Sequence, residues 1–161
     1  MIKIPFLLFA ISLFSVSVYS QNRFVVGGSL GLSVAGGVET SPGFQIGTMG
    51  EYYFNPENNK MAVGTGININ TQSGTPVEWA NYFKYFIEIN RPDIKPYIDA
   101  GLSLWFYPGG PSAAIRFGGG INFLVAPHIY IPADVQLGPV FATGTSVFYF
   151  AVTTGIRYEL P

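Results

Sequence analysis

Cysteine is absent from the 161-residue chain. No disulfide can stabilise the fold, and no lipid can be attached through a cysteine thiol. Charge is also scarce: charged residues make up 11% of the chain and the net charge at pH 7 is −1, whereas soluble domains carry about 25% charged residues. The composition therefore argues against an ordinary water-facing surface, and the near-neutral charge argues against a nucleic-acid partner.

No apolar run is long enough for a transmembrane helix, which needs about 20 residues. The run from Ile4 to Val18 follows Lys3 and ends next to Tyr19 and Ser20. This order of positive charge, apolar run and small or modest side chains predicts a signal peptide over residues 1–20, which directs export through the general secretory route and is cleaved. Residues 21–161 then form one domain of ordinary size.

Helical periodicity is missing after residue 20, and alternation of apolar with small or polar residues takes its place. The alternating segments are about ten residues long and are separated by Pro, Gly, Asn or Asp, which favour turns. The predicted strands are 24–35, 43–54, 60–70, 80–90, 95–106, 113–124, 129–141 and 146–160. The sequence therefore predicts an all-β fold of eight antiparallel strands.

The alternation gives the strands two chemically different faces. One face is apolar and almost uncharged, with residues such as Leu30, Ile46, Ile67, Leu102 and Phe117. The other combines Gly, Ser, Asn and Gln with seven charged residues: Glu51, Lys84, Glu88, Asp99, Arg116, Asp134 and Arg157. In a membrane barrel the apolar face contacts lipid and the polar face lines the lumen. In a soluble lipocalin-like carrier the apolar face would line a ligand cavity, but the water-facing surface would need more charges.

This two-face pattern predicts an eight-stranded antiparallel up-and-down transmembrane β-barrel in the outer membrane of a diderm bacterium. Side chains fill the interior of a barrel this small, and Tyr53, Phe86, Tyr97, Trp105 and Tyr130 are the bulky residues expected inside. We therefore expect a non-enzymatic, monomeric protein with a filled lumen that serves envelope integrity or surface interaction. A narrow channel for small solutes and a soluble carrier of an apolar ligand are the alternatives.

The seven charged residues of the polar face are expected to form a hydrogen-bonded network, because an unpaired charge in a confined lumen is costly. Arg116 is the predicted hub of this network, with Asp99 and Asp134 as its partners. The reason is that a forked guanidinium can hold two carboxylates at once.

The last strand resembles the β-signal that directs assembly of outer-membrane barrels. Its polar, glycine, aromatic and final apolar positions match Thr153, Gly155, Tyr158 and Leu160, although Leu160 replaces the usual Phe and a proline follows it. The segment 95–102 is similar to a strand start common in the small outer-membrane β-barrel families, the group that contains OmpA-, OmpX- and OmpW-type domains. The resemblance covers nearly all of residues 21–161. It implies contact with outer-membrane lipid and lipopolysaccharide, and biogenesis with periplasmic chaperones and the barrel-assembly machinery.

The same families include lipid A palmitoyltransferase and lipid A deacylase, and resemblance to those enzymes would imply a histidine working with a serine or an acid at the outer rim. The only histidine, His128, falls in a predicted periplasmic turn with no serine near it in the sequence. No second histidine, cysteine or dense Asp/Asn loop offers a metal site, and the glycine runs do not precede helices that would bind phosphate. We expect no catalytic, cofactor-binding or metal-binding residues.

Overall fold

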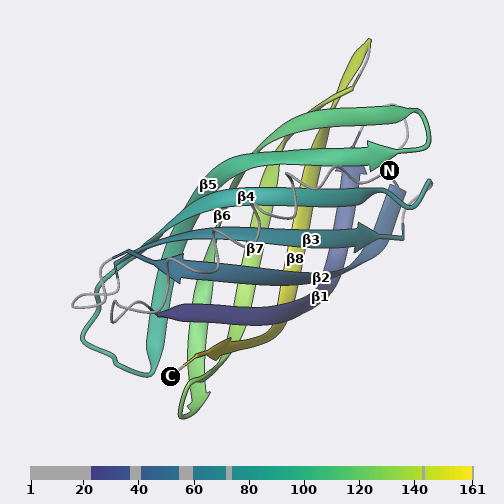
Figure 1. The fold of residues 1–161 in the computed structure, drawn as a ribbon. Coiled ribbons are helices and arrows are strands. Elements are labelled where there is room, and N and C mark those ends of the chain that lie inside the picture. The colour runs from purple at the N-terminus through teal and green to yellow at the C-terminus, as the bar shows by residue number, and fades with distance from the viewer. Residues whose placement is uncertain (1–22, 37–40, 55–59, 72–73, 143, 161) are drawn as a thin grey trace, which may run out of the picture.

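The computed structural model describes residues 23–36, 41–54, 60–71, 74–142 and 144–160. They form eight strands: β1 (Phe24–Gly36), β2 (Ser41–Tyr53), β3 (Met61–Asn70), β4 (Val77–Phe86), β5 (Ile94–Tyr107), β6 (Gly110–Ala126), β7 (Ile129–Ala142) and β8 (Thr145–Glu159). Each strand pairs antiparallel with the next, and β8 pairs with β1 (Figure 1). The predicted eight-stranded up-and-down fold is confirmed. The predicted signal peptide, residues 1–20, lies outside the described residues.

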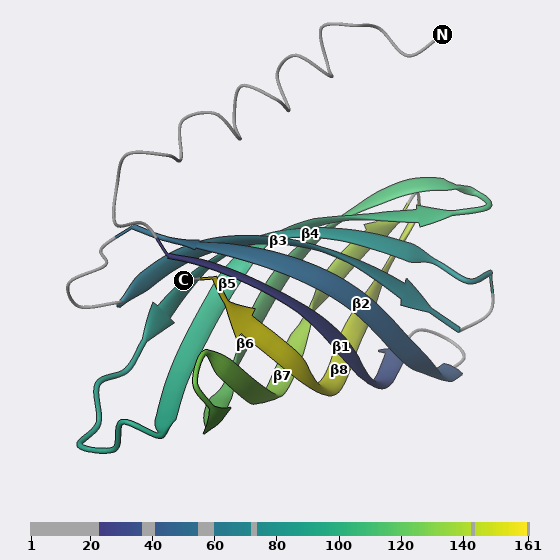
Figure 2. The same ribbon diagram turned by 60° about the horizontal axis from the view of Figure 1, so that its bottom comes forward.

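Residues point alternately into and out of the barrel, as the sequence pattern predicts. In β3, for example, Asn68 and Asn70 are buried in the lumen whereas Ile67 and Ile69 are exposed on the outside. The strands tilt and wind around the barrel (Figure 2), and closure of the sheet leaves no edge strand unpaired. None of the described residues forms a helix that is long and apolar enough to cross a membrane.

The outer surface of the barrel is a continuous apolar belt. Leu30, Phe44 and Leu102 are each more than 60% exposed, and most other large outward side chains are aliphatic or aromatic. An apolar surface of this extent is unfavourable in water but suits a lipid bilayer. In a soluble carrier the apolar face of the strands would line the interior, but in the structure this face lies on the outside of the barrel. The chain is thus a transmembrane β-barrel.

The structure differs from the sequence prediction mainly at β4, which spans Val77–Phe86 instead of 80–90. Glu88 therefore lies beyond the strand, where its side chain is 71% exposed and pairs with Lys60 at 3.0 Å. The prediction that Glu88 belongs to the lumen is wrong, because the apolar alternation continues past the end of the strand. Conversely, Glu78 was assigned to a connection, but it belongs to β4 and is buried in the lumen.

The two rims of the barrel differ in chemistry. The terminal rim holds the start of β1, the end of β8 and the connections β2–β3, β4–β5 and β6–β7; the β4–β5 connection and the C-terminal end lie at the lower left of Figure 1. The distal rim holds the other four connections, and only Pro108 and Gly109 separate β5 from β6. Among the described residues, all charged side chains are buried inside the barrel except a set at the terminal rim: Arg23, Lys60, Glu88, Arg91, Asp93 and Lys95.

Candidate functional site

Aromatic side chains occupy the lumen towards both rims. On the terminal side, Tyr53 stacks on Phe86 with ring centroids 5.4 Å apart, and Phe86 contacts Tyr97 at 5.7 Å. On the distal side, Trp105 meets Tyr149 edge to face at 4.7 Å. All five rings are buried. The lumen between these two aromatic layers is polar and contains most of the buried charge.

Arg157 forms the best-satisfied ion pair of the lumen. Its guanidinium donates to Asp134 Oδ2 at 2.6 Å, to Asn122 Oδ1 at 2.5 Å and to the Tyr97 hydroxyl at 3.1 Å. The Tyr97 hydroxyl in turn donates to Asp134 Oδ1. The forked guanidinium thus holds three acceptors from three other strands, which compensates the cost of removing both charges from water.

Lys84 and Glu51 form a second buried ion pair, and both side chains are almost completely enclosed. The Tyr82 hydroxyl donates to Glu51 Oε1 at 3.0 Å. The Lys84 ammonium also lies 4.1 Å from the centroid of the Tyr97 ring, which is a favourable cation–π distance. Tyr97 therefore contacts the cations of both pairs, so the two pairs belong to one network.

Arg116 pairs with an acid that the sequence analysis did not select. Its Nη1 lies 3.5 Å from Glu78 Oε1, and Asn68 donates to Glu78 Oε2 at 2.7 Å. The Arg116 guanidinium also lies 5.1 Å from the centroid of the Tyr82 ring. The only sequence signal for Glu78 was its alternation with Val77 and Trp79, which continues the period of the strand in the N-terminal direction.

The predicted hub, Arg116 holding both Asp99 and Asp134, is therefore wrong. Asp134 pairs with Arg157, and Arg116 pairs with Glu78 across the lumen. Asp99 lies inside as predicted, but its Oδ1 atom is buried and makes no hydrogen bond. Of the seven predicted network residues, six face the lumen and only Glu88 does not.

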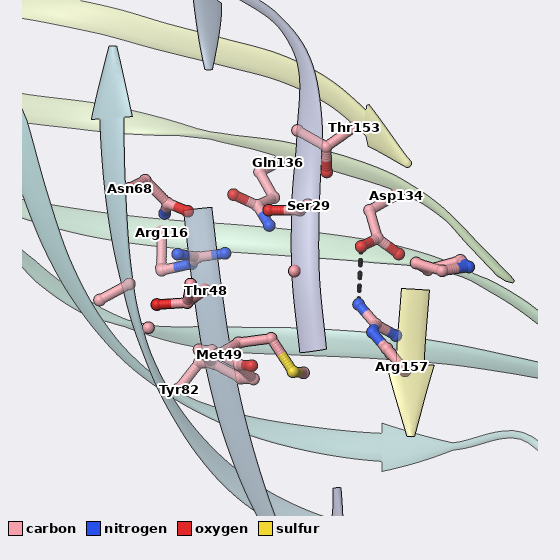
Figure 3. A pocket seen from close by; sticks show the side chains of 14 residues that line it. Ser29, Thr48, Met49, Asn68, Tyr82, Arg116, Asp134, Gln136, Thr153 and Arg157 are labelled. Carbon is pink, nitrogen blue, oxygen red and sulfur yellow. Dashed lines mark hydrogen bonds and ion pairs between the residues drawn. The ribbon is translucent and has the colours of Figure 1, made fainter. Parts of the chain in front are cut away.

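A small cavity of about 30 Å³ remains between the ion pairs. Arg116, Asn68, Gln136, Asp134 and Arg157 point towards it from β3, β6, β7 and β8 (Figure 3). Arg116 Nε and Gln136 Oε1 have no hydrogen-bond partner among the described residues. This volume has room for one or two water molecules and for nothing larger. At this level of the lumen, the described side chains therefore leave a cavity of water size.

A further polar chain crosses the mouth of the barrel at the terminal rim. Lys95 Nζ donates to the Tyr130 hydroxyl at 2.8 Å, and that hydroxyl donates to Glu159 Oε2 at 3.2 Å. Arg23 Nη1 lies 2.8 Å from Glu159 Oε1. The buried Glu159 was not among the predicted network residues. These linked side chains cover the lumen at the rim where the first strand begins and the last strand ends.

Exposed ion pairs surround the same rim. Arg91 Nε and Nη2 donate to the two oxygens of Asp93 at 2.9 and 2.7 Å, and these hydrogen bonds lower the pKa of Asp93. The hydrogen bond to Glu88 raises the pKa of Lys60. Because these pairs are exposed to water, they contribute little to stability. Each of these two pairs joins one acid to one base, so the two pairs together carry no net charge.

Three residues of the predicted assembly signal lie in β8, and the fourth, Leu160, directly follows it. Thr153 is buried in the lumen, whereas Tyr158 and Leu160 are about 40% exposed on the outside. Gly155 lies against the backbone of β1, where an added Cβ would meet Ser29 Cα at 2.8 Å. An outward aromatic and a final outward apolar residue agree with the pattern of the signal; its recognition by assembly factors stays a prediction.

The candidate catalytic residue has no catalytic surroundings. His128 lies in the β6–β7 turn at the terminal rim with a φ of 63°, and its carbonyl accepts a hydrogen bond from Glu159 N at 2.9 Å. In the described part of the chain, no hydrogen bond joins the imidazole to a serine or an acid. The described residues also contain no cluster of His, Cys, Asp and Glu that would hold a metal ion.

Comparisons with known proteins agree on the architecture. No protein-family model and no curated protein sequence matches the chain. Among solved structures, Neisserial surface protein A superposes with a TM-score of 0.73 at 18% identity, covering 85% of this chain and 97% of that chain. The N-terminal β-barrel domain of Pseudomonas aeruginosa OprF gives 0.57 at 10% identity, covering 86% and 98%. The outer-membrane enzyme PagL gives 0.50 at 13% identity, covering 85% and 99%.

These identities are too low to transfer an activity, but the chains superpose over nearly their full length. The barrel architecture is therefore the feature that the chain shares with these proteins. The chain has the fold of the small eight-stranded β-barrels of the outer membrane.

Proposed function

We propose that the protein is a non-enzymatic integral outer-membrane protein whose closed lumen makes it a structural component of the envelope. The observation that carries the proposal is the filled lumen, in which the pairs Arg157–Asp134, Lys84–Glu51 and Arg116–Glu78 lie between two aromatic layers. A pore would need an open path through these layers. An enzyme would need a nucleophile or a general base at a substrate-accessible site, and the lone histidine has no such setting.

The short distal connections support a structural role over host binding. If the terminal rim lies in the periplasm, the distal rim faces the cell exterior. One distal connection consists of Pro108 and Gly109 alone. The described residues of the distal rim carry no exposed charge. Contact with lipopolysaccharide would therefore involve acyl chains and exposed rings such as Phe44 and Phe148, without cations for the lipid phosphates.

Fractionation and a deletion strain test this role together. The protein should resist carbonate extraction and dissolve only in detergent. Cells that lack it should admit more of a hydrophobic fluorescent dye, because the outer membrane is weakened, and should take up small hydrophilic solutes at an unchanged rate. The wild-type gene should restore the barrier. An intact dye barrier combined with slower solute uptake would refute the structural role and favour the narrow channel.

A further inference from the structure

The β4–β5 connection borders a pocket at the terminal rim. Residues 87–93 form this connection, which lies at the lower left of Figure 1. A backbone hydrogen bond from Ile87 N to Pro96 O at 2.9 Å holds its base. The pocket has a volume of about 210 Å³. We call it the rim pocket, and its lining includes Lys60, Ile87, Glu88, Ile89, Arg91 and Lys95.

Charged side chains surround the rim pocket, and the cations outnumber the acids. Lys60 pairs with Glu88 at 3.0 Å, and Arg91 pairs with Asp93 at 2.7 Å. Lys95 is the third cation, and none of the ion pairs between described residues includes it. Three cations and two acids therefore leave one surplus positive charge at the pocket.

The Lys95 ammonium can bind a ligand without leaving its present position. Its Nζ donates to the Tyr130 hydroxyl at 2.8 Å and lies 4.7 Å from the centroid of that ring. The acid behind Tyr130 is Glu159, which already pairs with Arg23 at 2.8 Å. Because an ammonium group has three donors, Lys95 has further donors for an anion in the pocket.

The rim pocket also borders the apolar belt. Ile87 and Ile89 continue the outward alternation of β4 beyond its end, and both side chains are exposed. Tyr85 and Ile98, which are Cα partners in β4 and β5, belong to the belt and are exposed as well. The pocket thus lies where the belt ends and the charged rim begins. In a membrane barrel this boundary is at the depth of the lipid headgroups.

We propose that the rim pocket binds the phosphate of an anionic phospholipid, whose acyl chains lie along the belt beside Ile87 and Ile89. Water takes about 30 Å³ per molecule, so 210 Å³ holds about seven non-hydrogen atoms, which suits a phosphate and part of its glycerol. A phosphodiester carries one negative charge, which matches the surplus charge of the pocket. Basic pockets at the membrane surface bind lipid headgroups in this way. This site goes beyond the proposed envelope role and does not depend on it.

Native mass spectrometry of the folded barrel tests the lipid site. The protein is released from detergent micelles that contain phosphatidylglycerol and phosphatidylcholine in equal amounts, and the ratio of the two retained lipids is measured. The wild-type protein should retain phosphatidylglycerol in preference. Lys95→Gln and Lys60→Gln should each lower this preference about fivefold, because each removes one positive charge from the pocket. The matched control Arg23→Gln removes a cation of the same rim that does not line the pocket, and it should keep the preference.

Each variant is first shown to be folded by its changed migration on heating, and Lys95→Met or Lys60→Met replaces a glutamine variant that fails this check. Equal retention of the two lipids by the wild-type protein would overturn the proposal. So would an unchanged preference in either pocket variant, or an equal loss in Arg23→Gln, which would show general attraction to the rim. Inorganic phosphate at the concentration of the lipid should not displace it, since phosphate lacks acyl chains. Displacement would assign the pocket to a free anion and overturn the lipid site.

Discussion

At the scale of single residues, most buried charges of the lumen belong to an ion pair, and one buried carboxylate does not. Arg157, Lys84 and Arg116 each have a carboxylate partner, whereas Asp99 forms no ion pair with a described residue and its Oδ1 atom accepts no hydrogen bond from one. The sequence identified six of the seven inward charges that form the middle of the lumen, because they occupy alternate positions. It did not identify which acid pairs with which base, since partners across a lumen depend on the stagger of the strands, and periodicity carries no information on stagger.

Removal of the Arg116 guanidinium should destabilise the barrel. Arg116→Ala leaves Glu78 buried with only the Asn68 amide as a partner, and the expected loss is about 3 kcal/mol in the free energy of unfolding. Urea unfolding in lipid vesicles measures this loss. Arg91→Ala, which breaks an exposed rim pair, is the control and should leave the midpoint unchanged. Equal midpoints for both variants and wild type would show that the buried pair contributes nothing.

Replacement of a buried aspartate by asparagine should have different effects on stability at Asp134 and at Asp99. Asp134→Asn removes the charge that Arg157 and Tyr97 both contact, and it should lower stability by about 2 kcal/mol. Asp99→Asn removes a carboxylate without a hydrogen bond to Oδ1, so it should leave the unfolding midpoint unchanged or raise it. A larger loss for Asp99→Asn than for Asp134→Asn would contradict this account of the network.

At the scale of elements, strand identity was readable from the sequence and the strand ends were not. All eight strands were predicted because alternation and turn residues are local signals. At β4 the alternation runs through Ile87 and Ile89, but pairing with β5 ends at Phe86 opposite Tyr97. Where a strand ends depends on the register of its neighbour, which no local pattern encodes. For this reason the sequence pattern predicts Glu88 in the lumen and Glu78 in a connection, and both predictions are wrong.

Close contact between strands should make one inward glycine intolerant of a side chain. A Cβ at Gly120 on β6 would lie 2.7 Å from Asp134 Oδ1 and 2.9 Å from Tyr97 Oη, so Gly120→Ala should disturb the Arg157 network and cost about 1–3 kcal/mol. Gly50→Ala on β2, where the Cβ meets open space, is the matched control. The two urea midpoints should differ; if they coincide, crowding does not explain Gly120.

At the scale of the whole molecule, three features combine: an apolar exterior, a sheet without edges and a lumen filled by side chains. The exterior and the closure were predictable from the composition and the strand count. Two features appear only in the structure, because they depend on which connections share a rim. One is the lack of charge among the described residues of the distal rim, and the other is the row of hydrogen-bonded polar side chains at the terminal rim.

Closure of the sheet should make the folded protein resistant to SDS. A closed barrel offers no unpaired strand at which detergent can begin to separate the sheet. Protein taken from the membrane fraction should therefore migrate differently in SDS gels before and after boiling. Identical migration in the two samples would argue strongly against a closed barrel.

Planar-bilayer recording tests most directly whether the lumen is closed. The wild-type protein should show no steady conductance, because the aromatic layers and the three buried ion pairs fill the lumen on both sides of a cavity of about 30 Å³. Trp105→Ala combined with Tyr149→Ala, which removes the distal layer, should give brief openings at most, since the ion pairs remain. Large and stable single-channel steps from the wild-type protein would contradict the closed lumen and establish the channel instead.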